Sequence, residues 1–184
     1  TQRTLENLLN WSLSQMGGIK TDQQKVDVGE CLKEACCLME ESAARKNVAL
    51  DTQVQDSVKV WADPDQLQVV LRNLIHNAIK FSSFNDRIIL TAWTENNDCH
   101  ISIKDSGIGM THQEIEMIVG SKHYFSKTGT EQEKGTGLGL LLCKEFITRN
   151  GGELSIRSAL GQGTEVSFTL ALAEHEPTPK VAVH

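Results

Sequence analysis

The chain has 184 residues, with 24 acidic and 18 basic side chains and a net charge of −6 at pH 7. This length suits one compact α/β domain with a short additional element. The acidic excess argues against a nucleic-acid partner, because affinity for a phosphate backbone comes from clustered Lys and Arg.

The first element expected along the chain is a helix over residues 5–16, whose apolar side chains recur at helical spacing. Its apolar face suits a partner-facing or coiled-coil helix better than a helix packed on its own domain. Gly17 and Gly18 end it. We therefore separate residues 1–18 from a main domain at 19–172, and we expect the Pro-containing segment 173–184 to be a linker.

The main domain alternates predicted helices with pairs of predicted strands. Asp63 as N-cap and Pro64 at the first helical position predict a helix that continues to about Phe81. Further helices are expected at 29–46, 114–119 and 138–149, and strands at 25–28, 48–54, 58–61, 86–94, 99–104, 153–158 and 164–172. We expect 48–54 and 58–61 to form a hairpin. Short turns between strands predict a mixed, mostly antiparallel sheet with helices on one face, a two-layer α/β sandwich.

One helix carries a polar stripe beside its apolar stripe. Asn73, Asn77 and Lys80 fall on one face at spacings of four and three residues. An amide oxygen is a suitable ligand for Mg²⁺, and a lysine can neutralise phosphate. The alternative interpretation is an ordinary solvated helix edge.

The segment DSGIGM places Asp105 at the end of a predicted strand, directly before Gly107, Ile108 and Gly109. A carboxylate accepts a hydrogen bond from the exocyclic amine of adenine and disfavours guanine, which presents an oxygen there. A plain turn is the alternative.

Three glycines, Gly135, Gly137 and Gly139, follow a polar stretch at 111–136 and lead into a helix. A long, weakly structured stretch inside a compact domain is typical of a lid or binding loop. Free N–H groups at a helix start attract phosphate. The spacing is neither that of a Rossmann fingerprint nor that of a P-loop.

Together and in this order, these segments resemble the catalytic ATP-binding domain of sensor histidine kinases, which shares the Bergerat fold with gyrase and chaperone ATPases. The resemblance covers about residues 20–172. Its N box falls at 65–82, its glycine boxes at 105–110 and 135–140, its lid box at 124–130, and a third glycine turn at 161–164.

The resemblance implies ATP and Mg²⁺ as ligands, with Asn77 as the metal ligand. The nucleotide-binding residues it implies are Asn73, Asn77, Lys80, Phe81, Asp105, Gly107, Ile108, Gly109, Phe125, Lys127, Gly135, Thr136, Gly137, Leu138, Gly139 and Thr164. The lid departs from the family pattern, Phe-x-x-Phe with a nearby arginine, because this chain has Phe125 and Lys127 there. Which cation meets the γ-phosphate is left open.

The resemblance also implies the reaction and its partners. In gyrase-like relatives a glutamate that activates water stands at the position of Asn73, and an amide cannot act as a general base. We therefore expect transfer of the γ-phosphoryl group to a histidine on a separate dimerisation domain, and later to a response regulator receiver domain, in a full-length homodimer. Residues 1–16 resemble the end of the second dimerisation helix, and no histidine here lies in a phosphoacceptor motif. The alternatives are an ATP-sensing or degenerate kinase module and a gyrase-type clamp.

The five cysteines are odd in number and irregular in spacing, which disfavours a disulfide framework. No apolar run approaches the roughly 20 residues of a membrane span. We expect a cytoplasmic domain, with any membrane anchor of the full-length protein outside this chain.

Overall fold

The structure is a computed structural model that describes residues 20–54, 58–120, 129–130 and 137–173. The helix expected at 5–16 and most of the expected linker lie outside the described residues. The elements in chain order are β1 (Gln24–Asp27), α2 (Val28–Arg45), β2 (Ala49–Val54), β3 (Lys59–Ala62), α3 (Pro64–Phe81), β4 (Arg87–Glu95), β5 (Asp98–Lys104), α4 (His112–Gly120), α5 (Leu138–Arg149), β6 (Leu154–Ser158) and β7 (Thr164–Ala171).

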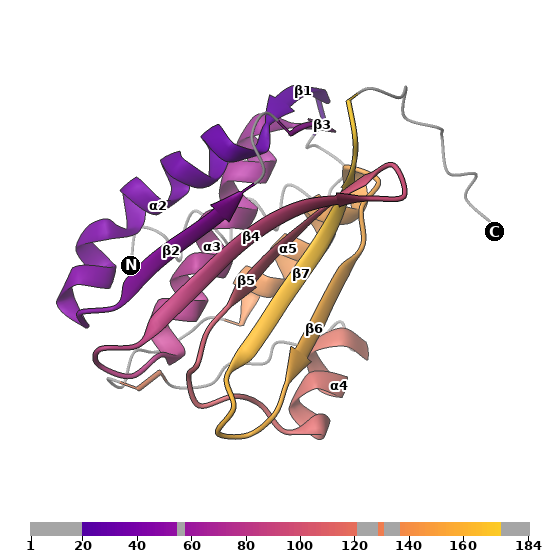
Figure 1. Ribbon diagram of the computed structural model, residues 1–184. Coiled ribbons are helices and arrows are strands. Elements are labelled where there is room, and N and C mark those ends of the chain that lie inside the picture. The colour runs from indigo at the N-terminus through magenta and orange to yellow at the C-terminus, as the bar shows by residue number, and fades with distance from the viewer. Residues whose placement is uncertain (1–19, 55–57, 121–128, 131–136, 174–184) are drawn as a thin grey trace.

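Five strands form one mixed sheet in the order β2-β4-β5-β7-β6. β2 pairs with β4 in parallel, and the other neighbours are antiparallel. Figure 1 shows α2, α3 and α5 along one face of the sheet, and α4 near the end of β6. The predicted two-layer sandwich with a mostly antiparallel sheet is therefore confirmed.

The core lies between this sheet and its helices. Alternate residues of β4 (Ile88, Leu90 and Ala92) are buried, as period-two side-chain alternation requires. α3 packs against both α2 and α5, which places it at the centre of the helical layer. Within the described ranges, no helix is long and apolar enough to cross a membrane.

The predicted hairpin of 48–54 with 58–61 is wrong. β2 joins the edge of the main sheet beside β4, with Ala49 opposite Arg87. β3 instead pairs with β1 in a separate two-stranded sheet, with Val60 opposite Val26. An alternating pattern predicts a strand but not the strand with which it pairs. Both segments therefore form strands as expected, and each pairs with a different strand from the one expected.

Side-chain caps set the helix starts. Asp63 Oδ1 accepts from the N–H of Gln66 at 3.0 Å, as the sequence predicted for α3. Asp27 caps α2, which begins one residue before the expected start. α4 begins at His112 rather than Glu114, because Thr111 and Glu114 form a reciprocal capping box, with Glu114 N to Thr111 Oγ1 at 3.2 Å and Thr111 N to Glu114 Oε2 at 2.7 Å.

Candidate functional site

The polar stripe of α3 lies partly inside the protein, where the helix meets α5. Asn73 and Lys80 are buried, with 9% and 5% of their surfaces exposed, and Asn77 is half-buried. Asn73 Nδ2 donates to the carbonyl of Val69 at 2.9 Å. A Cβ built on Gly139, in the first turn of α5, would lie 3.0 Å from Asn73 Oδ1. The structure therefore brings the α3 stripe and the last glycine of the GTGLG run together.

The end of α3 contacts the DSGIGM segment. The carbonyl of Phe81 accepts from the N–H of Ile108 at 3.2 Å. A Cβ on Gly107 would collide with the same carbonyl, so this approach requires glycine. Lys80 Nζ lies 4.8 Å from the centroid of the Phe81 ring, within the range of a cation–π interaction.

Asp105 is buried at the end of β5, and its side chain is fixed by two backbone donors. Oδ1 accepts from the N–H of Gly107 at 2.9 Å and from the N–H of Thr164 at 3.1 Å. Burial raises the pKa of the Asp105 carboxyl, and these two hydrogen bonds partly oppose that rise. Gly163, with a φ of 80°, allows the chain before Thr164 to approach Asp105 closely, because a Cβ on Gly163 would collide with the Asp105 carbonyl.

Two further glycines expected in the site, Gly109 and Gly137, lie in the DSGIGM segment and at the start of α5. Gly109 follows Ile108, whose carbonyl accepts from the N–H of Gly161 at 2.8 Å in the turn between β6 and β7. Gly137 is the N-cap of α5 in a left-handed conformation with a φ of 72°, and Leu138 directly after it is buried. α5 thus starts without a capping side chain, which suits a helix start that binds an anion.

The structure does not place every residue expected in the site. Phe125, Lys127, Gly135 and Thr136 lie outside the described residues. The described residues that it gathers around the C-terminal half of α3, the end of β5 and the start of α5 are Asn73, Asn77, Lys80, Phe81, Asp105, Gly107, Ile108, Gly109, Gly137, Leu138, Gly139 and Thr164.

Sequence reasoning missed one buried cation beside this region. Lys46, the C-cap of α2, is only 3% exposed, and its Nζ donates to the carbonyl of Lys80 at 3.0 Å. A lysine at the end of an amphipathic helix normally extends into water. Because its acceptors are mostly backbone carbonyls, which carry no sequence signal, only the tertiary structure could identify it.

The donor chemistry of the site fits a hydrated magnesium ion. Among the described residues, no three His, Cys, Asp or Glu side chains gather where they could hold a metal. Mg²⁺ keeps several waters and takes few protein ligands, with substrate phosphates supplying the rest. The amide oxygen of half-buried Asn77 is a ligand of that kind.

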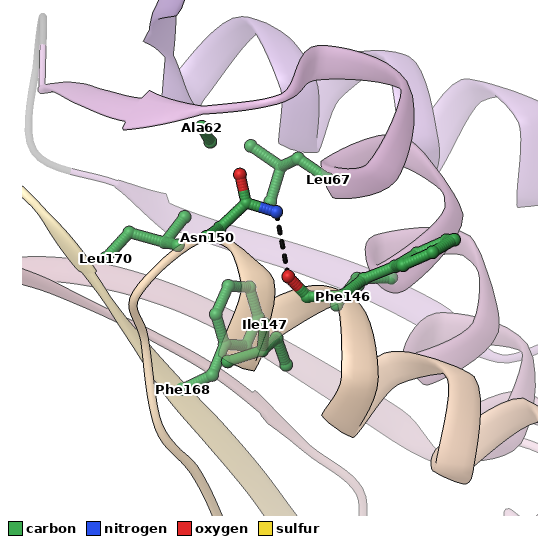
Figure 2. A pocket seen from close by; sticks show the side chains of 8 residues that line it. Ala62, Leu67, Phe146, Ile147, Asn150, Phe168 and Leu170 are labelled. Carbon is green, nitrogen blue, oxygen red and sulfur yellow. Dashed lines mark hydrogen bonds between the residues drawn. The ribbon is translucent and has the colours of Figure 1, made fainter. Parts of the chain in front are cut away.

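A small apolar cleft elsewhere in the protein has a structural role (Figure 2). It is lined by Ala62, Leu67, Val70, Phe146, Ile147, Asn150, Phe168 and Leu170, none of which is an expected site residue. Its one polar lining residue, Asn150, donates to the carbonyl of Phe146 at 2.8 Å and to Gln66 Oε1 at 2.9 Å, and accepts from the N–H of Asp63 at 2.7 Å. These contacts tie the end of α5 to the start of α3.

A family model and a curated relative both relate this chain to histidine kinases. A family model described as histidine kinase-, DNA gyrase B-, and HSP90-like ATPase matches residues 62–174. An uncharacterised sensor-like histidine kinase of Rhizobium meliloti (strain 1021) is 31% identical over 167 residues, which are 90% of this chain and 32% of that protein. The chain spans still smaller shares, 13% and 18%, of two other curated relatives.

Solved structures share the fold. Full-length ShkA in complex with AMPPNP superposes with a TM-score of 0.76 at 24% identity, covering 91% of this chain and 35% of that one. The histidine kinase ThkA in complex with the response regulator TrrA gives a TM-score of 0.71 at 19% identity, covering 92% of this chain and 48% of that one.

Proposed function

The chain belongs to the family of histidine kinase-, DNA gyrase B- and HSP90-like ATPases, as an ATP-binding catalytic domain of the sensor histidine kinase type, and from this premise we propose how it works. It binds magnesium–ATP between α3, the end of β5 and the start of α5, and it transfers the γ-phosphoryl group to a histidine on a separate dimerisation domain. The buried, backbone-anchored carboxylate of Asp105 is the observation that carries this proposal.

Asp105 recognises the adenine. Its hydrogen bonds to Gly107 and Thr164 both use Oδ1, so Oδ2 is the oxygen that accepts from the exocyclic amine. A guanine would present a carbonyl oxygen to the carboxylate, which is repulsive. Gly107 allows the end of α3 to lie against the segment after Asp105, because a Cβ there would collide with the Phe81 carbonyl.

Asn77, Lys80 and the start of α5 hold the triphosphate. The Asn77 amide oxygen would ligate a magnesium ion, and that ion would neutralise charge on the phosphates. Lys80 supplies a positive charge from the same turn of α3. The N–H groups of the first turn of α5, after Gly137, face the phosphates as donors.

The site favours transfer to an acceptor over hydrolysis. Asn73 is an amide whose Nδ2 donates to the Val69 carbonyl, and an amide cannot take a proton from water. The bond between the γ-phosphorus and its bridging oxygen breaks, a phosphorus–nitrogen bond forms on the acceptor imidazole, and ADP leaves. Positioning and charge neutralisation do most of the work in such transfers.

The acceptor histidine and the next partner come from other domains. The structure of ThkA with the response regulator TrrA supports a receiver domain as the second partner. This chain spans 32% of a sensor-like histidine kinase, so that relative has room for further domains. We infer that a dimerisation domain of this kind presents the histidine.

A transfer assay tests this function. The chain is mixed with a dimerisation domain that carries the phosphoacceptor histidine and with ATP labelled on the γ-phosphate. We expect label on that domain and none on its His→Gln variant. Calorimetry run in parallel measures ATP binding. Binding without transfer would favour an ATP-sensing module, and absence of binding would overturn the proposal.

A further inference from the structure

The carbonyl end of α3 is held by two other segments of the chain. Lys46 Nζ donates to the carbonyls of Ile79 at 3.2 Å and Lys80 at 3.0 Å. Thr130 donates from its N–H to the Lys80 carbonyl at 3.2 Å and from Oγ1 to the Ser82 carbonyl at 2.7 Å. The last carbonyls of a helix have no partner within the helix, so these bonds satisfy groups that α3 cannot satisfy itself.

Lys46 and Thr130 also contact each other, with 2.8 Å between Nζ and Oγ1. The ammonium is buried, and three oxygen acceptors surround it. A buried charge is stable only where it is well hydrogen-bonded, and the carbonyl end of a helix has a partial negative charge that favours a cation. Lys46 is therefore part of the folded interior rather than a solvated surface lysine.

Thr130 belongs to a different part of the chain. It is exposed and lies in the connection between α4 and α5. Its hydroxyl and N–H join that connection to α3 and, through Lys46, to the end of α2. One ammonium thus links three segments that are far apart in sequence.

The turn that these residues hold is the turn that carries the site. Asn77, Lys80 and Phe81 all lie in the last two turns of α3. The Phe81 carbonyl additionally accepts from Ile108, in the segment that follows Asp105. A shift of this turn would therefore move the phosphate-binding side chains relative to the adenine-binding carboxylate.

We propose that Lys46 and Thr130 are positioning residues for the nucleotide: their contact fixes the C-terminal turn of α3 and thereby the spacing between its metal- and phosphate-binding side chains and Asp105. The inference rests on the proposed ATP site. Neither residue has to touch ATP to act in this way.

Thr130→Val and Lys46→Met test the contact. Valine keeps the branched shape of threonine and removes the hydroxyl at an exposed position, so the fold should survive. Methionine keeps most of the unbranched stem of lysine and removes the ammonium. Thr130→Ser keeps the hydroxyl, and Lys33→Met removes an exposed lysine from the same helix, so these two variants are the controls.

Calorimetry with magnesium and AMPPNP measures each dissociation constant, and thermal unfolding checks each fold. We expect Thr130→Val and Lys46→Met each to weaken AMPPNP binding about tenfold, because each removes a charge-assisted hydrogen bond. The double variant should bind little more weakly than Lys46→Met alone, because both substitutions remove the same contact. Both controls should bind like the original chain. If Lys46→Met does not fold, Thr130→Val against Thr130→Ser decides.

The outcomes separate this inference from the proposed function. If the original chain does not bind AMPPNP, the proposed function fails. If it binds and Thr130→Val binds equally well, or if the two losses simply add, the positioning role is wrong. A lower thermal midpoint for Thr130→Val without weaker binding would mean a purely structural role and would also overturn it.

Discussion

Asp105 Oδ1 accepts a hydrogen bond from the N–H of Thr164 at 3.1 Å, although 59 residues of chain separate the two. The Asp105 N–H donates back to the Thr164 carbonyl at 2.9 Å. This reciprocal pair holds the carboxylate at the junction of β5 and β7. Within the described part of the chain, both hydrogen bonds to the carboxylate use Oδ1, so the direction of Oδ2 is set before any ligand arrives.

Replacing Asp105 with Asn should remove the preference for adenine. The amide oxygen can still accept from Gly107 and Thr164, which then places the NH₂ group toward the adenine amine, donor against donor. We expect ATP affinity to fall on the order of 10- to 100-fold and the discrimination against GTP to disappear. Calorimetry with both nucleotides measures this. Asp98→Asn, at the opposite end of β5, is the matched control, and an unchanged ATP preference in Asp105→Asn would contradict the assignment.

The raised pKa of Asp105 predicts that ATP binding weakens on acidification. The carboxylate must be ionised to accept from the adenine amine, and burial moves its pKa above the ordinary aspartate value of about 3.9. Affinity should therefore begin to fall at a higher pH than an ordinary aspartate would cause. ATP binding in that range should release a proton, so the calorimetric enthalpy should depend on the ionisation enthalpy of the buffer. A buffer-dependent enthalpy that persists in Asp105→Asn would assign the proton to another group.

The raised pKa of Asp105 has the opposite effect on the stability of the fold: acidification weakens ATP binding but stabilises the folded state. The folded state holds the Asp105 proton more tightly than the unfolded state, so this group contributes its full stabilisation below the unfolded pKa. That contribution is lost as the pH rises through the raised folded pKa. In the absence of nucleotide, the unfolding free energy of Asp105→Asn should therefore change less with pH than that of the original chain. The difference should lie between the unfolded and the folded pKa of Asp105.

Asn77 should control the magnesium dependence of binding. Asn77→Ala removes the amide oxygen, so we expect nucleotide affinity with and without Mg²⁺ to become similar. Asn77→Asp keeps a hard oxygen ligand and should retain a clear response to the metal. Calorimetry in buffers with Mg²⁺ or with EDTA makes the comparison. A metal response in Asn77→Ala as large as in the original chain would place the ion on other residues.

Local chemistry accounts for the parts of this protein that its sequence predicted well. The Asp63–Pro64 start of α3 is a short-range capping pattern, so the helix and its polar stripe could be placed from sequence. The Thr111–Glu114 capping box is equally local and was available as a signal for the start of α4. Strand partners are not local, and for this reason β2 and β3 were assigned to each other. Lys46 was missed because its partners are mostly backbone carbonyls of residues far away in sequence.

Two glycines in the turn between β6 and β7 provide a matched pair. Gly161 and Gly163 have φ values of 75° and 80°, so alanine is strained at both positions. A Cβ at Gly161 meets nothing within 4 Å, whereas one at Gly163 collides with the Asp105 carbonyl. Gly161→Ala should cost about 1 kcal/mol of stability and leave ATP affinity nearly unchanged. Gly163→Ala should cost more and also weaken ATP binding, because Asp105 must move. Chemical denaturation measures the stability and calorimetry measures the ATP affinity. Equal losses for the two substitutions would mean that the contact between Gly163 and Asp105 does not contribute to ATP binding.

Asn150 should affect stability without affecting the site. Its side-chain amide bridges the Asp63 N–H, Gln66 Oε1 and the Phe146 carbonyl, and Figure 2 shows the bond to Phe146. Asn150→Ala removes all three bonds and takes the acceptor of the buried Asp63 N–H away. We expect the unfolding free energy to fall by about 3 kcal/mol. Gln66 and Lys80 stand at opposite ends of α3, about 20 Å apart at the helical rise.

Because of that separation, the folded fraction of Asn150→Ala should bind ATP with nearly the original affinity. Urea unfolding gives the stability and calorimetry gives the affinity, with Gln53→Ala, an exposed amide on β2, as control. A loss of ATP affinity in Asn150→Ala that matches the loss in Asp105→Asn would show that the two ends of α3 are coupled. In that case the contacts at the start of the helix, and not only those of Lys46 and Thr130 at its end, would determine how the nucleotide-binding side chains are placed.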